Sequence, residues 1–206
     1  MKILHVDCSP RLESHSRALS AALLDTIKAV LVDVDVCRRD IGYESIPHIQ
    51  QSYALTLTSL DMISQASESV MAPSETLIRE VEMADVIVIG TPMYNCSLPS
   101  VLKAWFDQIL RVGRTINTGP AGKYGVLKDK PVYVGIASGG YFRGKLATQP
   151  DFLTPYIEFA LGSIGISSIQ FFALEGTASL DLVKLESKIA AELSSLDILI
   201  LPDSCV

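Results

Sequence analysis

Residues 85–90 read Asp-Val-Ile-Val-Ile-Gly, an almost unbroken run of branched apolar side chains that ends at a glycine. Alternating apolar and polar residues are typical of a strand with one face in water, whereas a continuous apolar run indicates a strand buried on both faces. The next segment, GTPMYNCSLP over residues 90–99, is more polar, and from Pro99 onward apolar residues recur at helical spacing. This stretch therefore predicts a buried strand, a loop and a helix, which is the repeating unit of a parallel sheet.

The same unit recurs on both sides of this stretch. In the second of the four further strands that we expect, valines alternate with aspartates, which indicates a half-buried strand near a sheet edge. The four strands are expected at residues 2–6, 32–36, 131–137 and 168–174. Helices are expected to begin near residues 16, 74, 99, 155 and 182, the second ending at Ala84 and the third at Gly113, while residues 38–72 are polar and expected to be irregular.

Five strands alternating with helices predict an α/β fold, a doubly wound five-stranded parallel sheet with helices on both faces. We expect a single domain over residues 1–206, because this length is enough for one large core. Ligands of such sheets bind beyond the carboxyl ends of the strands. The loops after the first, third and fourth strands are therefore the candidate site.

The composition narrows the class of partner. The formal net charge is -6 and the pI is about 5.0, so the chain lacks the broad positive charge with which proteins bind nucleic acid or anionic membranes. No apolar stretch has the length of a signal-peptide core or a membrane span. The four cysteines are far apart, which predicts free thiols and a cytoplasmic protein without a metal site.

The first loop, DCSPRLESHS, precedes a helix N-terminus, where unpaired N–H groups and the helix dipole favour a phosphate. Its serines could equally be helix caps. Cys8 invites comparison with a tyrosine phosphatase, but the residue six positions on is Ser14 rather than arginine, and neither Arg11 nor Arg17 has the required spacing. We therefore expect Cys8 to be a half-buried structural cysteine.

Other candidate residues carry weaker signals. Gly139 to Lys145 nearly matches a phosphate-binding P-loop, but Leu146 replaces the hydroxyl that would hold Mg²⁺. His5 lies in a predicted central strand and is expected to be a core residue. Trp105 and Phe106 lie on an apolar helical stripe and are expected in the core or at a subunit contact.

Taken together, the three loops resemble those of the FMN-dependent NADH azoreductase and NADH:quinone oxidoreductase family, which has a flavodoxin-like fold. The similarity covers nearly the whole chain. It includes the serine loop, the block TPMYNCSLPSVLKAWFDQILRVG at residues 91–113, GPAGKYGVLKDK at 119–130, the Ser-Gly-Gly loop, and TPYIEFALGSIGI at 154–166.

The resemblance implies the cofactors, the reaction and the site. FMN is implied as cofactor, with NADH or NADPH as electron donor, in a ping-pong two-electron reduction of quinones and azo compounds by a homodimer. The implied phosphate ligands are Ser9, Ser14, His15 and Ser16. One edge of the flavin ring would meet Met93, Tyr94, Asn95 and Cys96, and the other edge Ser138, Gly139 and Gly140. Because a flavin supplies the redox chemistry, no catalytic acid or base is expected, only ring-edge support from Asn95, Gly139 and Gly140.

Two departures from the family pattern and two alternatives stay open. Many members carry an arginine in the Ser-Gly-Gly loop, and aromatic residues often stand where this chain has Ile116, Asn117 and Thr118. A flavodoxin-type electron carrier would share the fold and FMN. A non-flavin phosphate-binding module would share only the first loop.

Overall fold

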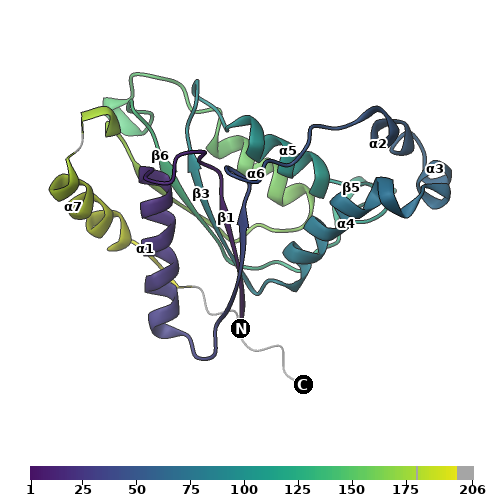
Figure 1. Ribbon diagram of the computed structural model, residues 1–206, viewed down its shortest axis with the longest axis horizontal. Coiled ribbons are helices and arrows are strands. Elements are labelled where there is room, and N and C mark those ends of the chain that lie inside the picture. The colour runs from purple at the N-terminus through teal and green to yellow at the C-terminus, as the bar shows by residue number, and fades with distance from the viewer. Residues whose placement is uncertain (180, 199–206) are drawn as a thin grey trace.

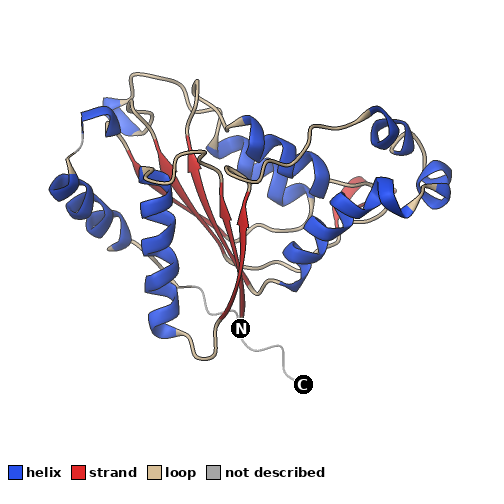
Figure 2. Ribbon diagram, viewed as in Figure 1, coloured by secondary structure: helices blue, strands red, loops and turns tan. Residues whose placement is uncertain are grey.

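The computed structural model describes residues 1–179 and 181–198 and contains one five-stranded parallel sheet in the order β2-β1-β3-β6-β7 (Figures 1 and 2). Its strands are β1 Lys2–Asp7, β2 Asp35–Asp40, β3 Val86–Pro92, β6 Val132–Ala137 and β7 Ile169–Leu174. The long helices are α1 His15–Val30, α4 Glu68–Met83, α5 Ser100–Ile109, α6 Thr154–Ser163 and α7 Leu182–Leu193. This confirms the predicted doubly wound α/β fold.

Helices cover both faces of the sheet, with α1 and α7 on one side and α4, α5 and α6 on the other (Figure 1). The two faces explain the unbroken apolar run in β3. Val86 and Val88 pack into the cluster that contains the apolar side of α1, and Ile87 and Ile89 pack into the cluster that contains α4, α5 and α6. Because helices cover both faces of β3, none of its side chains faces water, and so none needs to be polar.

The second strand lies three residues later than the alternation of valines predicts. β2 is at the sheet edge, as expected, but it pairs with β1 from Lys2 opposite Asp35 to Asp7 opposite Asp40. The preceding residues form the turn out of α1, where Asp33 has a φ of 53° and Val32 is 82% exposed. The valine alternation therefore lies partly in the turn, and the strand predicted at residues 32–36 was placed three residues too early.

The segment 38–72, expected to be irregular, contains the short helices α2 Gln51–Thr56 and α3 Leu60–Gln65. These two helices lie beyond α4, at the end of the molecule opposite α7 (Figure 1). α4 itself begins at Glu68 and not near residue 74, so Pro73 lies inside the helix. The helix start predicted near residue 74 was therefore too late.

A β-hairpin that the sequence did not suggest, β4 Ile116–Gly119 and β5 Gly122–Gly125, follows α5. Its first strand contains Ile116, Asn117 and Thr118, the positions where the family often has aromatic side chains. The hairpin packs tightly against the end of α6, because a Cβ atom on Gly125 would lie 2.0 Å from the backbone nitrogen of Gly165. No side chain fits there, so Gly125 is required by this close approach.

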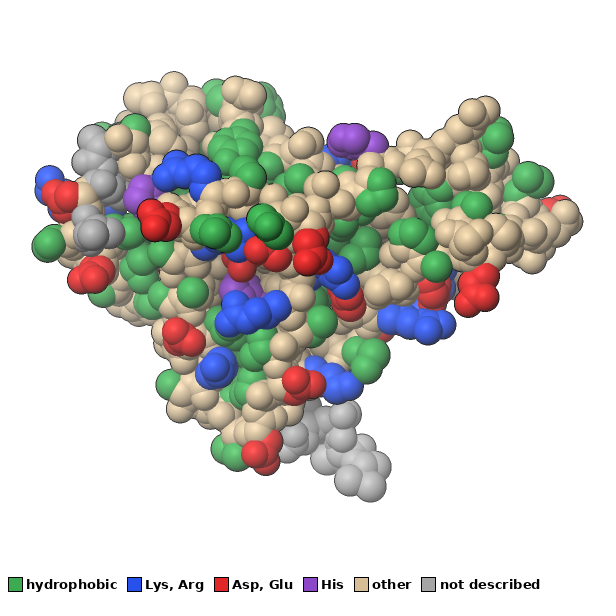
Figure 3. All heavy atoms as spheres, in the orientation of Figure 1, with side chains coloured by type: hydrophobic (Ala, Val, Ile, Leu, Met, Phe, Trp, Pro, Cys, Tyr) green, Lys and Arg blue, Asp and Glu red, His purple; other side chains and the backbone are tan. Residues whose placement is uncertain are grey.

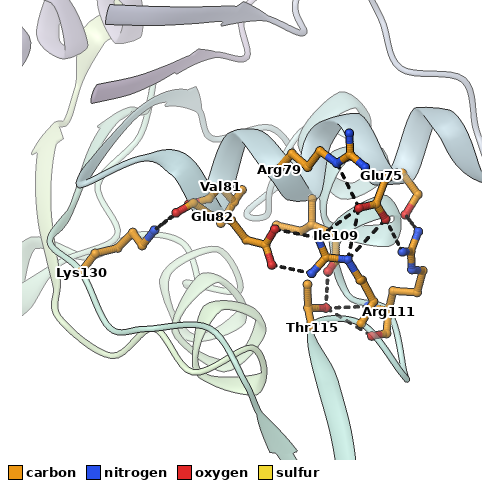
Figure 4. Close-up of polar contacts among 10 residues, drawn as sticks. Glu75, Arg79, Val81, Glu82, Ile109, Arg111, Thr115 and Lys130 are labelled. Carbon is orange, nitrogen blue, oxygen red and sulfur yellow. Dashed lines mark hydrogen bonds and ion pairs between the residues drawn. The ribbon is translucent and has the colours of Figure 1, made fainter. Parts of the chain in front are cut away.

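Buried polar contacts hold the hairpin and α5 to α4 (Figure 4). α5 ends at Ile109, earlier than the expected stop at Gly113, because the Thr115 hydroxyl donates to the Ile109 carbonyl at 2.6 Å and accepts from the Arg111 amide at 3.0 Å. Arg111 is buried and contacts Glu75 of α4 at 2.6 Å. The guanidinium groups of Arg114 and Arg111 lower the pKa of Glu75 to about 2, so this carboxylate stays ionised at neutral pH.

The last turn of α4 is closed by a residue distant in sequence. The ammonium of Lys130 donates to the carbonyls of Val81, Glu82 and Ala84 at 2.6, 3.1 and 2.5 Å (Figure 4). These carbonyls have no partners within the helix, so the cation satisfies the C-terminal end and complements its dipole. Burial lowers the pKa of Lys130.

Candidate functional site

The three loops selected from the sequence meet at the carboxyl edge of the sheet, the upper edge in Figure 1. Backbone hydrogen bonds fix where each loop leaves its strand. The Cys8 amide donates to Gly90, the Met93 amide to Ala137, and the Ser138 amide to Leu174, at 2.9, 2.8 and 2.8 Å. Because each bond reaches the neighbouring strand, the loops begin side by side.

The serine loop ends in a well-formed helix cap. Ser14 has extended backbone angles, and its hydroxyl accepts from the Arg17 amide at 3.2 Å and lies 3.1 Å from the hydroxyl of Ser16. Ser9, Ser14 and Ser16 are buried, and His15, the first residue of α1, is half-buried. The cap interpretation is therefore confirmed for Ser14.

A cap does not satisfy the whole helix end. Among the described residues, the amides of His15 and Ser16 donate to no acceptor, as is usual for the first turn of a helix. Two unpaired amides beside two hydroxyls form a donor set suited to an anion. The donors expected from the sequence for a phosphate thus lie together.

Arg17 holds the first loop in place, a role that the sequence analysis did not assign to it. Its guanidinium donates to the Ser9 carbonyl at 2.6 and 3.1 Å and to both carboxylate oxygens of Asp40 at 2.8 and 2.6 Å, and it lies 3.5 Å from Asp7. It therefore binds the backbone of the loop and does not point at the anion site. This ion pair holds the pKa of Asp40 below its ordinary value.

Cys8 lies underneath this loop. It is fully buried, deeper than the half-buried position expected, and burial raises the pKa of its thiol. A protonated, inaccessible thiol is no nucleophile, so the structural interpretation of Cys8 is confirmed. His5 is also a core residue, as expected, with its Nε2 atom 3.0 Å from the Ser20 hydroxyl, and burial lowers its pKa.

The second loop is a tight turn that presents polar groups. Tyr94 and Ser97 exchange two backbone hydrogen bonds of 3.0 Å, and between them Asn95 and Cys96 have φ values of 48° and 66°. Two central residues with positive φ are required by a type I′ turn, and asparagine tolerates this region better than most residues. Met93 is buried, whereas Tyr94 and Asn95 are exposed. The turn thus directs Tyr94 and Asn95 to the loop surface.

In the third loop the two glycines differ. Among the described residues, a Cβ atom on Gly139 would meet only Ala178, at 3.9 Å, and Gly139 has no positive φ, so no described contact requires glycine there. On Gly140 a Cβ atom would lie 2.7 Å from the side-chain oxygen of Gln149. The open side of Gly139 is suited to close approach by a ligand, whereas Gly140 makes room for a neighbouring side chain. Ser138, before them, is buried.

The near-match to a P-loop in this segment does not have P-loop geometry. Residues 144–146 form a single short 3-10 turn, with no α-helix before Thr154. The Arg143 guanidinium contacts Glu192 and Glu175 at 2.8 and 3.4 Å, so its charge is already compensated. The segment is not a nucleotide-hydrolysis site.

Acidic and basic side chains are interspersed over the face shown in Figure 3. Within residues 1–179 and 181–198, no helix is long and apolar enough to cross a membrane. In the same part of the chain, no three His, Cys, Asp or Glu side chains are grouped as metal ligands.

Comparison with known proteins agrees with this geometry. The chain matches the family described as having a flavodoxin-like fold, over residues 1–197. An FMN-dependent NADH:quinone oxidoreductase 4 of Pseudomonas fluorescens is 39% identical over 175 residues, 84% of each chain. An FMN-dependent NADH:quinone oxidoreductase 5 of Burkholderia lata is 42% identical over 180 residues, 85% of each chain. The crystal structure of an azoreductase from Bacillus anthracis has a TM-score of 0.81 at 24% identity, covering 94% of this chain and 95% of that one.

These findings define the chain as a flavodoxin-like protein. Within that class, it belongs to the family of FMN-dependent NADH:quinone oxidoreductases, which confirms the resemblance inferred from the three loops.

Proposed function

We infer that this single-domain chain is an FMN-dependent NADH:quinone oxidoreductase that also reduces azo compounds. The observation that carries the inference is the meeting of three features at one sheet edge: the donor set at the start of α1, the Asn95 turn and the open side of Gly139. A flavin mononucleotide has a dianionic phosphate at one end and a flat ring at the other. The two relatives that share 39% and 42% of their residues with this chain are named for the same cofactor, donor and substrate.

Each loop has a distinct part in the proposed site. At the phosphate end, hydroxyls and amides neutralise negative charge by hydrogen bonding, through Ser9, Ser14, His15 and Ser16. One edge of the ring is assigned to Met93, Tyr94, Asn95 and Cys96, and the other to Ser138, Gly139 and Gly140. Bound FMN supplies hydride and electron transfer, and the chain contributes alignment and the local electrostatic environment.

The reaction is proposed to be ping-pong: NADH would give up its hydride and leave as NAD⁺ before the quinone or azo compound enters and takes up the two electrons. One pocket serves both substrates in this scheme, so double-reciprocal plots at several fixed quinone concentrations are expected to be parallel. Purified protein is expected to be yellow and to oxidise NADH faster than NADPH. Intersecting lines would contradict the ping-pong order. A yellow protein without NADH-dependent turnover would indicate a flavodoxin-type carrier, and failure to bind FMN would leave only the phosphate-binding alternative.

Trp105 and Phe106 were expected in the core or at a subunit contact, and both are fully buried within the chain. They therefore leave no aromatic surface on α5 for a homodimer contact. Exposed aromatic residues instead lie nearer the loops: Phe152, whose amide donates to Cys96, is 61% exposed, and Phe159 on α6 is 71% exposed. Large apolar side chains in water are typical of a protein contact surface.

We therefore propose that α6 and the residues before it form the homodimer contact. Sedimentation of the parent protein is expected to give about twice the chain mass of 22.3 kDa. Phe159→Glu should shift the protein toward monomer, because a carboxylate would be buried without a partner. Val183→Glu on α7, a similarly exposed site on the opposite side of the sheet, is the matched control and should remain dimeric. A dimeric Phe159→Glu variant would place the contact elsewhere.

A cytoplasmic location is also proposed. Cys8, Cys37 and Cys96 are free, and Cys37 is exposed, so its thiol depends on a reducing environment. The fourth cysteine, Cys205, lies outside the described residues. Fractionation of the native host cells checks this proposal.

A further inference from the structure

The segment between β6 and α6 folds back on itself. Thr148 and Gln149 both donate their amides to the carbonyl of Tyr141, at 2.8 and 3.2 Å. These bonds close residues 141–149 into a loop whose last side chain, Gln149, is half-buried. Nothing in the sequence pattern singles out this glutamine.

The side-chain amide of Gln149 joins two loops that are far apart in the sequence. Its nitrogen donates to the Ser138 hydroxyl at 2.9 Å and to the Met93 sulfur at 3.1 Å. A thioether sulfur can only accept, so the nitrogen and not the oxygen of the amide must face Met93. The two protons of one amide group are therefore used on the two loops.

The chain leaves space for this amide. A Cβ atom on Gly140 would lie 2.7 Å and 3.1 Å from the side-chain oxygen and carbon of Gln149. A side chain at position 140 would therefore displace the amide of Gln149 from its place between the two loops, although Gly140 has no positive φ. Glycine at position 140 thus leaves the space that the amide occupies.

We propose that Gln149 is a positioning residue that sets the spacing between the Met93 loop and the Ser138 loop, and so prepares the slot between them for the flavin ring. This inference rests on the proposed function, which assigns these loops to opposite edges of the ring. A slot held open before binding lowers the entropic cost of ordering its walls. Gln149 contributes through Ser138 and Met93 and takes no part in electron transfer.

The test compares FMN affinity, measured by fluorescence titration of the apoprotein, in three variants. Gln149→Leu keeps much of the volume but donates no hydrogen bond, and it is expected to weaken FMN binding about tenfold. Thr148→Ala is the matched control, because it alters the same loop and leaves the closing backbone bonds intact; its FMN affinity should stay within about twofold. The double variant Ser138→Ala with Gln149→Leu should bind FMN about as tightly as Gln149→Leu alone, since both changes remove the hydrogen bond between these two side chains.

A second readout separates positioning from general stabilisation. Gln149→Glu keeps the length of the side chain but places a negative charge between the two loops, which should lower the midpoint potential of bound FMN. A purely structural role, away from the ring, would leave the potential unchanged and would overturn the proposal. So would Gln149→Leu if it bound FMN as well as Thr148→Ala does, or more tightly, because the amide would then be dispensable or would obstruct the slot. If the parent protein bound no FMN, the proposed function itself would fail and this inference with it.

Discussion

Ser14→Asp is expected to weaken FMN binding at least about a hundredfold without unfolding the protein. Aspartate is as good a helix cap as serine, and its charge is favourable at a helix N-terminus, so α1 should keep its start at His15. The same carboxylate would stand beside the amides of His15 and Ser16, where the phosphate dianion is proposed to bind. Like charges at this distance repel, and the anion site would already be occupied by the side chain.

Ser14→Asn is the matched control, since asparagine also caps helices well but carries no charge. We expect it to bind FMN within about threefold of the parent, with a similar thermal midpoint in the apoprotein. Ser16 is a poorer position for this test, because its side chain is fully buried and a carboxylate there would disturb packing. Equal FMN affinity in Ser14→Asp and Ser14→Asn would show that the phosphate does not bind at this helix end.

The sequence predicted those parts of the fold that depend on local pattern. The run at residues 85–90 indicated a strand buried on both faces because a side chain on either face meets a helix, and the structure places Ile87 and Val88 in different core clusters. The three candidate loops followed from one topological rule, that ligands bind at the carboxyl ends of parallel strands.

Register and exposure could not be predicted in the same way. The edge strand starts where Lys2 finds a partner at Asp35, a pairing across the sheet that the valine alternation does not contain. Trp105 on α5 could have faced either the core or a second subunit, because an apolar stripe looks the same in both cases. The structure places it wholly in the core.

The residues that organise the site were missed because they act over long sequence distances. Gln149 reaches Met93, which is 56 residues away, and Arg17 reaches Asp40, which is 23 residues away. Neither contact follows a periodic pattern or a short motif. The fixed spacing tested for a phosphatase arginine correctly excluded Arg17 from that role, but it gave no sign that the guanidinium binds a backbone carbonyl.

Arg17→Met is expected to lower the free energy of unfolding of the apoprotein by about 2 kcal/mol and to weaken FMN binding about tenfold or more. Methionine preserves the apolar stem but removes the donors that hold the Ser9 carbonyl and both oxygens of Asp40. Asp7, which is mostly buried, would also lose its nearby positive charge. Without these contacts the first loop has fewer bonds that fix Ser9, so its donors must be ordered at the moment of binding.

The control for charge is Arg11→Met, which removes the same charge from the same loop. Arg11 is exposed, and within the described part of the chain its guanidinium makes only a 3.4 Å contact to the Glu13 carbonyl, so its loss should cost less than about 0.5 kcal/mol. Urea unfolding must be measured on FMN-free protein, because bound FMN would add its own stabilisation to every variant that binds it. If Arg17→Met and Arg11→Met were equally stable and bound FMN equally well, the effect would be one of net charge alone. A loss of stability and FMN affinity in Arg17→Met alone would instead show that Arg17 fixes the first loop through the Ser9 carbonyl, without contacting the anion.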